Sequence, residues 1–464
     1  MAIMTARDVA LHLLERVECD GAFVDRILTS PEMEHLSPRD RALVREIVLG
    51  VLRWKSRLDR IIDLYYTKKT SPPGPLSVHG EGNKRGEVDM AVRNAVRLGL
   101  FQVMFLDSIP DHAAVSETVS SITRLRGKGA GGLANALLRR FIREGEPGNW
   151  PSEPAVRYAF ELSHPGWLVQ RWIEAFGADE ALSVMRAGNE RRPVFVRPGH
   201  NGVSPETLAA SLALEGFESS VVTEMPGWIE VSGPLRQSAS TTSGTGFFET
   251  AAFNNGLFAV QDPPAGMASL LLSPRPGEHV LDLCAAPGGK TTHLALLMED
   301  RGRIRAVDLH EKRLGLVREA ARRLGYTSIV CETGDAKSYG RGTVEQFDRV
   351  LLDVPCSGTG VFSKRPDLKW RVTGEDVSRL SGIQRDMLEN AARLVREGGV
   401  LVYSTCTLEH EENEDTVQHF IDGHPEFIIE RDKRFERFEH GCGYLMLPHQ
   451  MMGTGAFAAL LRRR

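Results

Sequence analysis

The stretch Val280-Leu281-Asp282-Leu283-Cys284-Ala285-Ala286-Pro287-Gly288-Gly289-Lys290-Thr291-Thr292 decides the fold of the second half of the chain. Its apolar-rich start is typical of a buried strand, a turn of small residues follows, and the apolar spacing of residues 293–298 favours a helix. Glycine in such a turn lets a ligand approach the backbone, and the free N–H groups at a helix start bind polar ligand atoms. The stretch therefore predicts a cofactor site.

Two common cofactor motifs do not match the spacing of this turn. A phosphate-binding P-loop needs a glycine six residues before its lysine, and the residue six positions before Lys290 is Cys284. A dinucleotide fingerprint reads Gly-x-Gly-x-x-Gly, whereas this turn reads Ala-Ala-Pro-Gly-Gly-Lys. A tight strand-to-helix turn without a ligand is a further alternative, because glycine pairs are common in turns.

Four more strand-like segments follow the turn, at residues 303–308, 329–336, 347–353 and 399–404. Strands that alternate with helical patterns predict an α/β Rossmann-like domain with a mostly parallel, doubly wound sheet, whose ligands bind at the carboxyl ends of the strands. Asp308 lies about 20 residues beyond the glycine turn, where an acid of this fold binds a ribose. Capping of the next helix is the alternative role for Asp308. Asp335 lies where the acid of this fold meets an adenine amino group.

Two cysteines, Cys356 and Cys406, each follow one of these strands. A free cysteine is often only a small buried hydrophobe, and this is the alternative for either one alone. Because both come after a strand of the domain that holds the cofactor turn, a chemical role for the pair is favoured.

Three stretches of this domain resemble the Sun family of RNA cytosine-C5 methyltransferases. They are the cofactor turn, Asp353-Val354-Pro355-Cys356-Ser357-Gly358, and Ser404-Thr405-Cys406-Thr407 with Asn413 after an acidic stretch. The resemblance implies that Cys406 is the nucleophile, that Cys356 assists product release, and that Asp353 contacts the target base or the cofactor. In the related DNA enzymes the Pro-Cys cysteine is the nucleophile, so this assignment of roles rests on the family.

The same resemblance implies S-adenosylmethionine as the cofactor. The residues implied to bind it are Cys284, Ala285, Ala286, Pro287, Gly288, Gly289, Lys290, Asp308, Arg313, Asp335 and Asp353.

Cytosine-C5 methylation explains why two thiols are useful. Carbon 5 of a pyrimidine is a poor nucleophile, and a thiolate that adds at carbon 6 makes carbon 5 able to attack a methyl group. A free cysteine is only a few per cent thiolate near neutral pH, so the site must favour ionisation of the nucleophile. A base must then remove the proton from carbon 5 before the thiolate leaves, and a second thiol can do so.

Residues 1–148 are predicted to form an all-helical domain. Helical spacing of apolar residues recurs at residues 9–17, 42–52 and 90–106, Thr5 can cap the first helix, and a helix restarts behind Pro110. The stretches that resemble the NusB-like RNA-binding domain are Arg39–Leu43, Arg97–Gln102, Ile109–Val115 and Ala134–Arg140. Residues 68–87 are rich in proline and glycine and predict an exposed loop.

Basic residues in three places could contact phosphate. Arg124–Gly129 with Arg139, Arg140 and Arg143 is predicted to do so, and a solvated helix end is the equal alternative. Arg191, Arg192 and Arg197 are either phosphate contacts or ordinary charges of an edge strand. Lys364, Arg365 and Lys369 match the family and could guide the RNA strand, whereas Trp370 is more often a core residue.

Residues 149–250 are predicted to form a helical linker and a small α+β subdomain, which resembles the subdomain that precedes such catalytic domains. Its strands are expected at residues 191–197 and 228–231, with a helix at 204–214 between them and a loop at 238–244. Residues 251–464 complete the chain as the methyltransferase domain.

Composition agrees with a soluble globular protein. Of 464 residues, 42% are apolar and 25% charged, and the net charge of −4 gives no global sign of nucleic-acid binding, although a basic face would suffice. The sequence shows neither an apolar run long enough to span a membrane nor a signal peptide, so a cytoplasmic location is expected. Six cysteines without a Cys-x-x-Cys pair indicate neither a disulfide framework nor a zinc site, and Cys19, Cys284, Cys331 and Cys442 are interpreted as packing residues.

The order of the domains resembles the RsmB/Sun type of bacterial 16S rRNA cytosine-C5 methyltransferases. The resemblance implies a monomeric enzyme without a metal that acts on a single-stranded or looped cytidine, because the base must leave its stack to meet both thiols. A transfer-RNA cytosine methyltransferase is an alternative, because it shares the catalytic motifs, but the helical N-terminal domain argues against it. A non-enzymatic RNA-binding or antitermination factor would explain only residues 1–148.

Overall fold

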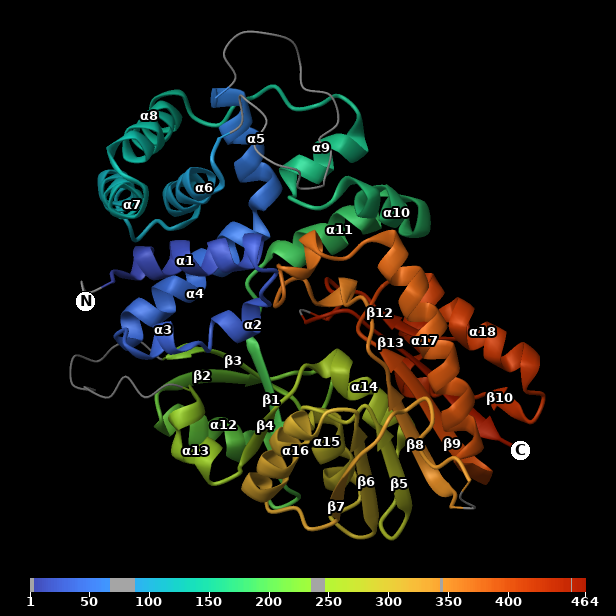
Figure 1. Cartoon of the computed structure of the whole chain (residues 1–464). Helices are drawn as coiled ribbons and strands as arrows, with labels where there is room; N and C mark the ends of the chain where they lie inside the picture. Colours follow the sequence, from blue (N-terminus) through green and yellow to red (C-terminus); the bar gives the residue numbers. More distant parts are fainter. Residues whose placement is uncertain (1–3, 67–87, 235–246, 343–344, 452) are drawn as a thin grey trace. The chain divides into compact units, whose positions relative to one another are not determined.

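The computed structural model describes residues 4–66, 88–234, 247–342, 345–451 and 453–464 (Figure 1). The loops predicted at residues 68–87 and 238–244 lie outside these ranges. The chain divides into two compact units, one made of Met1–Asn189 with Arg365–Arg371, the other of Glu190–Lys364 with Val372–Arg464. Among the described residues, no helix is long and apolar enough to cross a membrane.

The described elements of the first unit's continuous part are helices, as its apolar spacing predicts. Thr5 caps the first helix: its side chain accepts the N–H of Asp8, whose carboxylate accepts the N–H of Thr5 in return. The helices are α1 (Ala6–Cys19), α2 (Val24–Ile27), α3 (Pro31–Glu34), α4 (Pro38–Arg53), α5 (Lys55–Tyr66), α6 (Met90–Phe105), α7 (Asp111–Arg126), α8 (Lys128–Glu144), α9 (Pro154–Glu161), α10 (Gly166–Phe176) and α11 (Ala178–Asn189).

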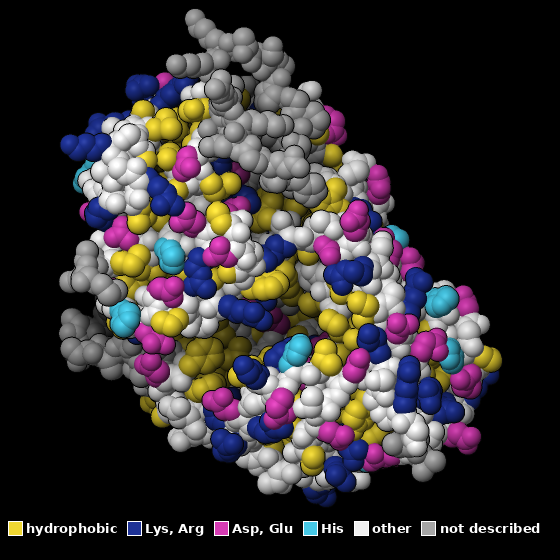
Figure 2. Space-filling view, viewed as in Figure 1, with side chains coloured by type: hydrophobic (Ala, Val, Ile, Leu, Met, Phe, Trp, Pro, Cys, Tyr) yellow, Lys and Arg dark blue, Asp and Glu magenta, His cyan; other side chains and the backbone are white. Residues whose placement is uncertain are grey.

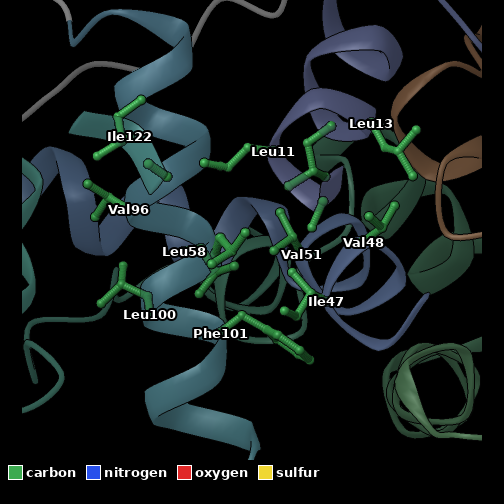
Figure 3. Close-up of a cluster of buried hydrophobic side chains, with 14 of the residues drawn as sticks. Leu11, Leu13, Ile47, Val48, Val51, Leu58, Val96, Leu100, Phe101 and Ile122 are labelled. Carbon is green, nitrogen blue, oxygen red and sulfur yellow. The ribbon is translucent and has the colours of Figure 1, made fainter. Parts of the chain in front are cut away.

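The core of this unit forms mainly between the apolar faces of α1, α4, α5, α6, α7 and α8. Figure 3 shows the ring of Phe101 beside Ile47, with the other labelled aliphatic side chains of the core around them. Gly50 of α4 is needed for this contact, because a Cβ at that position would lie 1.9 Å from the Phe101 ring. Arg97 of α6 is buried beside this core, and its guanidinium lies 2.6 Å from Asp59 and 3.2 Å from Glu18. The NusB-like stretch around Arg97 therefore serves folding.

The segment Arg365–Arg371 belongs to this helical unit although it follows the Cys356 motif in the sequence. The indole N–H of Trp370 donates to the carbonyl of Leu52 at 2.6 Å, and the Arg371 guanidinium donates to the carbonyl of Gly21 at 2.9 Å. Arg365 lies 2.5 Å from the carboxylate of Asp25. The segment is thus held by backbone carbonyls and by an acid of the first unit.

The second unit begins with a four-stranded antiparallel sheet in the order β2-β3-β1-β4. It confirms the predicted α+β subdomain, with a helix between the first two strands. Its elements are β1 (Val194–Pro198), α12 (Pro205–Leu214), β2 (Phe217–Val221), β3 (Ile229–Pro234), the 3-10 turn Phe247–Glu249, α13 (Ala251–Asn254) and β4 (Phe258–Val260).

The described residues of the rest of the unit form a nine-stranded sheet with flanking helices, in the strand order β11-β12-β13-β9-β8-β5-β6-β7 with β10 paired to β13. The strands β9, β8, β5, β6 and β7 are parallel, and β13 runs antiparallel to β9. The strands are β5 (His279–Leu283), β6 (Arg303–Asp308), β7 (Ile329–Thr333), β8 (Phe347–Asp353), β9 (Val395–Thr405), β10 (Phe427–Ile429), β11 (Glu439–His440), β12 (Gly443–Met446) and β13 (Ala456–Arg463).

Helices flank this sheet (Figure 1) and bury its central strands. Val280, Leu281 and Leu283 of β5 are fully buried, as expected for a parallel strand covered on both faces. The predicted α/β sheet is confirmed, and the expected ligand edge lies at the carboxyl ends of β5, β6, β8 and β9. The helices are α14 (Pro263–Leu272), α15 (Gly289–Leu297), α16 (Glu311–Leu324), α17 (Gly374–Arg393) and α18 (Glu414–Gly423), with 3-10 turns at Thr359–Val361, Leu368–Trp370, His410–Glu412 and Lys433–Phe438.

Candidate cofactor and cysteine site

The cofactor turn leaves β5 through two residues with left-handed backbone. Cys284 has φ 64° and Gly288 has φ 105°, and α15 starts at Gly289. A Cβ at Gly288 would lie 3.1 Å from the Cα of Val317, so both the dihedral and the space favour glycine there. At Gly289 a Cβ would meet nothing within 4 Å. The turn thus places an open stretch of backbone at a helix start, which suits a polar cofactor.

Asp308 and Arg313 hold this turn from the next βα unit. The Asp308 carboxylate accepts the N–H of Ala286 at 3.2 Å and the N–H of His310 at 3.0 Å. Arg313 donates to the carbonyl of Ala286 at 2.7 Å and lies 3.5 Å from Asp308. The residue that caps α16 is His310, and it makes no side-chain capping bond. The Asp308 carboxylate therefore contacts both the cofactor turn and the residue that caps α16.

Asp335 lies beyond β7, half-buried, and its carboxylate accepts the N–H of Lys337 at 2.9 Å. It borders a hollow of about 620 Å³ whose other walls include Asp386, Asn390 and Arg393. The predicted acids thus lie at the edge of the sheet where the turn lies, because Asp308 ends β6 and Asp335 follows β7. An acid after each neighbouring strand and an open glycine backbone fit a nucleoside cofactor.

Lys290 and Asp353 form an ion pair between the cofactor turn and the strand that precedes Cys356. The Lys290 Nζ lies 2.7 Å from one Asp353 oxygen, and the Ser404 hydroxyl donates to the other oxygen at 2.7 Å. Burial alone would lower the pKa of Lys290, but the carboxylate of Asp353 outweighs it and raises that pKa. A fixed positive charge therefore persists at this edge of the sheet.

The two predicted cysteines are in direct contact. Their sulfur atoms lie 3.1 Å apart, and the backbone N–H of Cys406 donates to the sulfur of Cys356 at 3.2 Å. The hydrogen bond from Cys356 lowers the pKa of Cys406, and the charge of Lys290 acts in the same direction. The same bond, together with burial, raises the pKa of Cys356. Cys406 is therefore the thiol of the pair that ionises first.

A buried polar network joins the two cysteine-bearing turns. The hydroxyls of Ser357 and Thr407 lie 2.7 Å apart, and the N–H of Gly360 donates to the carbonyl of Cys406 at 3.1 Å. Gly360 allows this approach, because a Cβ there would lie 2.7 Å from the Cys406 carbonyl oxygen. Asn413 accepts the Thr405 hydroxyl at 2.6 Å and donates to the Thr407 carbonyl at 3.1 Å.

Two buried acids near the site were not among the predicted residues. Asp282 of β5 accepts the Thr291 hydroxyl at 2.6 Å, and burial raises its pKa to about 7. Glu412 accepts the N–H of Ser357 at 2.9 Å and is fully buried. Asp282 lies in the quoted cofactor stretch and Glu412 in the acidic stretch before Asn413, but an acid's burial cannot be read from such local patterns.

The two interpretations of Arg197 are both wrong. β1 is an inner strand of its sheet, and Arg197 is 1% exposed. Its guanidinium donates to Gln261 at 2.7 Å, to the Thr292 hydroxyl at 2.9 Å and to the Gly289 carbonyl at 3.2 Å. Burial lowers its pKa to about 10. Arg197 thus braces the start of α15 from the neighbouring sheet, which leaves no room for phosphate. Arg192 is also largely buried and lies 3.6 Å from Glu190.

The prediction that Lys369 guides RNA is also wrong, because Lys369 is 1% exposed. Its Nζ lies 2.5 Å from the Asn189 side-chain oxygen inside the helical unit. Trp370 is half-buried, and the packing role expected for it agrees with its bond to Leu52. Lys364 pairs with Asp262 and keeps an exposed side chain.

The basic stretch of the helical unit is partly paired. Arg124 contacts Asp8 at 2.9 Å and Arg126 contacts Glu15, yet both guanidinium-bearing side chains are about half exposed. Arg140 and Arg143 both pair with Glu144. The face shown in Figure 2 carries Lys and Arg side chains interspersed with Asp and Glu. Cys19, interpreted as a packing residue, is exposed, whereas Cys442 is buried and Cys284 and Cys331 are intermediate.

Comparison with known proteins places this chain in a family. The family model described as 16S rRNA methyltransferase RsmB/F matches residues 269–462, its ferredoxin-like domain matches 164–236, and the NusB family matches 4–143. Ribosomal RNA small subunit methyltransferase B of Escherichia coli O1:K1 is 32% identical over 99% of this chain and 98% of its own. The chain belongs to the RsmB/F family of 16S rRNA methyltransferases.

Other relatives agree with this assignment. The protein named "Probable ribosomal RNA small subunit methyltransferase B" of Bacillus subtilis is 35% identical, with 99% of both chains covered. The solved structure of PH0851 matches with a TM-score of 0.76 at 26% identity over 99% of each chain. That of NSun6 from Pyrococcus horikoshii gives a TM-score of 0.56 at 25% identity, over 63% of this chain and 97% of the other. The chain is therefore an S-adenosylmethionine-dependent methyltransferase of ribosomal RNA.

Proposed function

We propose that this RsmB/F-family enzyme methylates carbon 5 of a specific cytidine in 16S rRNA through a covalent bond between Cys406 and carbon 6 of the base. The observation that carries the proposal is the contact of the two thiols, 3.1 Å apart, with Cys406 the one whose pKa is lowered. A methyltransferase that acted on an already nucleophilic nitrogen or oxygen would have no use for a paired thiol and thiolate at its site.

The cofactor binds, in this proposal, along the edge of the sheet formed by the cofactor turn and the acids after β6 and β7. The backbone from Cys284 to Gly289 faces it at the start of α15, Asp308 binds its ribose, and Asp335 binds its adenine. Arg313 fixes the turn through the Ala286 carbonyl. When bound, S-adenosylmethionine supplies an electrophilic methyl group.

Cys406 starts the reaction as a thiolate. Lys290 and the hydrogen bond from Cys356 favour this ionised form, so the sulfur can add to carbon 6 of a cytidine that has left its stack. The addition makes carbon 5 electron-rich, so that carbon 5 can act as the nucleophile toward the methyl group that bound S-adenosylmethionine would supply, with S-adenosylhomocysteine as the leaving group. Asp353 is held by Lys290 and Ser404, and in this proposal it contacts the base or the cofactor.

Cys356 completes the cycle. Once Cys406 is bonded to carbon 6 it no longer accepts the hydrogen bond from Cys356, and Cys356 releases its thiol proton to solvent. As a thiolate it takes the proton from carbon 5 after methyl transfer, the double bond between carbons 5 and 6 reforms, and the Cys406 thiolate leaves. The raised pKa of Cys356 makes this thiolate a strong base. Residues 1–148 and 149–250 serve, in this proposal, as an RNA-binding domain and a pre-catalytic subdomain for the methyltransferase domain of residues 251–464.

The test is transfer of a labelled methyl group to purified small-subunit RNA, followed by nucleoside analysis. Label in 5-methylcytidine at one position of 16S rRNA is the expected result. Label in transfer RNA alone would retain the chemistry and overturn the substrate. Label in a different methylated nucleoside would overturn the chemistry.

A further inference from the structure

Glu412 is a buried acid beside the cysteine pair to which the reaction above gives no role. It ends the 3-10 turn His410–Glu412, which follows the Cys406 motif, and its side chain is fully buried. One carboxylate oxygen, Oε2, accepts the N–H of Ser357 at 2.9 Å and the side-chain amide of Gln384 at 2.7 Å. The other oxygen, Oε1, is buried and has no hydrogen-bond partner within the described part of the chain.

The bonds of Glu412 enclose Cys356 on both sides along the chain. The amide of Gln384 that contacts Glu412 also donates to the Pro355 carbonyl at 2.9 Å, and the N–H that Glu412 accepts belongs to Ser357. Pro355 and Ser357 are the two neighbours of Cys356. A single carboxylate thus fixes, directly and through Gln384, the backbone that carries this thiol.

Tyr403 holds Glu412 in place. Its hydroxyl donates to the Glu412 carbonyl at 2.5 Å and lies 3.3 Å from the Gln384 side-chain oxygen, and all three side chains are fully buried. Because Tyr403 lies on β9 three residues before Cys406, the cluster joins the turns of both cysteines. We expect these bonds to hold the two turns at the separation at which the sulfur atoms are in contact.

Glu412 has no cationic partner among the described residues. Burial, together with the nearby Glu409, raises its pKa, and its carboxyl group in turn raises the pKa of the Cys356 thiol. A buried acid with one unsatisfied oxygen is costly, and such groups are retained where they position or tune reacting atoms.

We propose that Glu412 is a positioning residue for the reaction: through Ser357 and the Gln384 bridge to Pro355, it fixes the turn that presents Cys356 to carbon 5 of the base. The inference rests on the proposed function, because it assumes that Cys356 assists release of the product. It predicts that loss of Glu412 slows the release step more than the addition of Cys406.

Four full-length proteins test this role: wild type, Glu412→Ala, Glu412→Gln, and Asp415→Ala as a control. Asp415 is a neighbouring exposed acid that contacts His410. Each protein is incubated with small-subunit RNA and S-adenosylmethionine, and kcat, KM and the fraction of protein in a denaturant-stable RNA adduct are measured. We expect Glu412→Ala to lower kcat and raise the adduct fraction by about tenfold with KM little changed, since the lost bonds act on the release step.

The conservative variant separates positioning from a role of the charge. Glutamine at position 412 keeps a side-chain oxygen that accepts the Ser357 N–H, so Glu412→Gln should restore most of the wild-type kcat and adduct fraction. Adduct accumulation as large in Glu412→Gln as in Glu412→Ala, or none in either, would overturn the positioning role. If Glu412→Ala does not fold, Gln384→Leu removes the bridge to Pro355, and a wild-type adduct fraction in that variant would contradict the proposal.

The wild-type protein distinguishes this inference from the proposed function. If wild type makes neither 5-methylcytidine nor an adduct, the proposed function fails. If wild type makes 5-methylcytidine and Glu412→Ala behaves in the same way, only the role of Glu412 fails.

Discussion

Lys290 and Lys369 are both largely removed from solvent, but their surroundings differ in charge. Lys290 lies 2.7 Å from the Asp353 carboxylate, which raises its pKa. Lys369 contacts neutral oxygens, at 2.5 Å from the Asn189 side chain and at 3.4 Å and 3.5 Å from the carbonyls of Ser163 and Arg53. Burial, with the charge of Arg53, lowers its pKa well below the usual lysine value.

The difference separates a lysine of the site from a lysine of the framework. A buried cation persists where a carboxylate balances it, and its field then acts on the atoms around it. Lys290 keeps such a charge beside Cys406, whereas Lys369 serves as a hydrogen-bond donor that fastens Arg365–Arg371 into the helical unit. Both lysines lie in family-like stretches, so motif membership alone does not assign a chemical role.

Of the two lysines, Lys290 should affect methyl transfer more strongly when it is replaced. Lys290→Met removes the cation that lowers the pKa of Cys406, so that pKa rises and the acid limb of the pH–rate profile moves to higher pH. Methyl transfer at pH 7 should fall by about a hundredfold, as for loss of one electrostatic stabiliser at a reacting centre. The pH dependence of single-turnover methyl transfer measures both changes. An unmoved acid limb would show that Lys290 does not act on Cys406.

Removing the partner carboxylate should move the same limb the other way. Asp353 raises the pKa of Cys406, so Asp353→Asn should lower that pKa and shift the acid limb to lower pH. Activity should still fall, by roughly tenfold or more, because Lys290 loses its half-buried partner and, in the proposed reaction, the base or cofactor loses a contact. Iodoacetamide alkylation rates of Cys406 as a function of pH would report the shift independently of turnover.

Loss of a turn contact should weaken cofactor binding without moving the pH profile. Arg313→Ala removes the bond to the Ala286 carbonyl, and the half-exposed position of Arg313 limits its contribution. We expect the Kd for S-adenosylmethionine to rise about tenfold, equivalent to 1.4 kcal/mol, with the release step unchanged. Isothermal titration calorimetry measures the Kd. Arg318→Ala, which removes an exposed pair with Glu311 on the same helix, is the matched control and should leave the Kd unchanged.

Replacing Lys369 should change the thermal stability of the protein and its pH dependence rather than the rate of methyl transfer. The pKa of Lys369 is lower in the folded chain than in the unfolded chain. Between these two pKa values the unfolded chain therefore binds more protons than the folded chain. The free energy of unfolding consequently rises with pH in that window. Wild type should therefore gain Tm relative to Lys369→Met as pH rises from 7 to about 10, the ordinary lysine pKa being about 10.4. Buried His164 beside it, whose pKa is also lowered, titrates below this window.

Lys312→Met, at an exposed position of α16, is the control for this pH series. Its Tm difference from wild type should stay constant across the same pH range. A constant difference for Lys369→Met as well would show that Lys369 keeps its charge in the folded protein.

Most of the fold could be predicted from local sequence patterns. The strand and turn at residues 280–289, the four later strands and the helical N-terminal half follow from hydrophobic periodicity, glycine and capping residues, which act over a few neighbours. The two cysteines proposed for the reaction were also recognisable as a pair, because Cys356 and Cys406 follow strands of one parallel sheet. Their family resemblance supplied the roles that spacing alone left open.

What the sequence could not show was which charged residues lose contact with water. Arg197 and Lys369 look like surface cations in their local sequence, yet their partners include residues 64 to 316 positions away in the chain. Glu412 is likewise buried against a residue distant in the chain, since its partner Ser357 lies 55 residues earlier. Burial of a charge depends on such long-range packing, for which a single sequence gives no local signal.

The most direct measurement is the identity of the cysteine that carries the RNA adduct. Cys356→Ala protein, incubated with small-subunit RNA and S-adenosylmethionine, should accumulate an adduct that survives denaturation; after nuclease and protease digestion, mass spectrometry should find a methylated cytidine on the peptide that contains Cys406. Cys406→Ala should form no adduct, and Cys331→Ala should behave as wild type. An adduct in Cys406→Ala attached to Cys356 would reverse the two roles, and no adduct in any variant that makes 5-methylcytidine would contradict covalent catalysis.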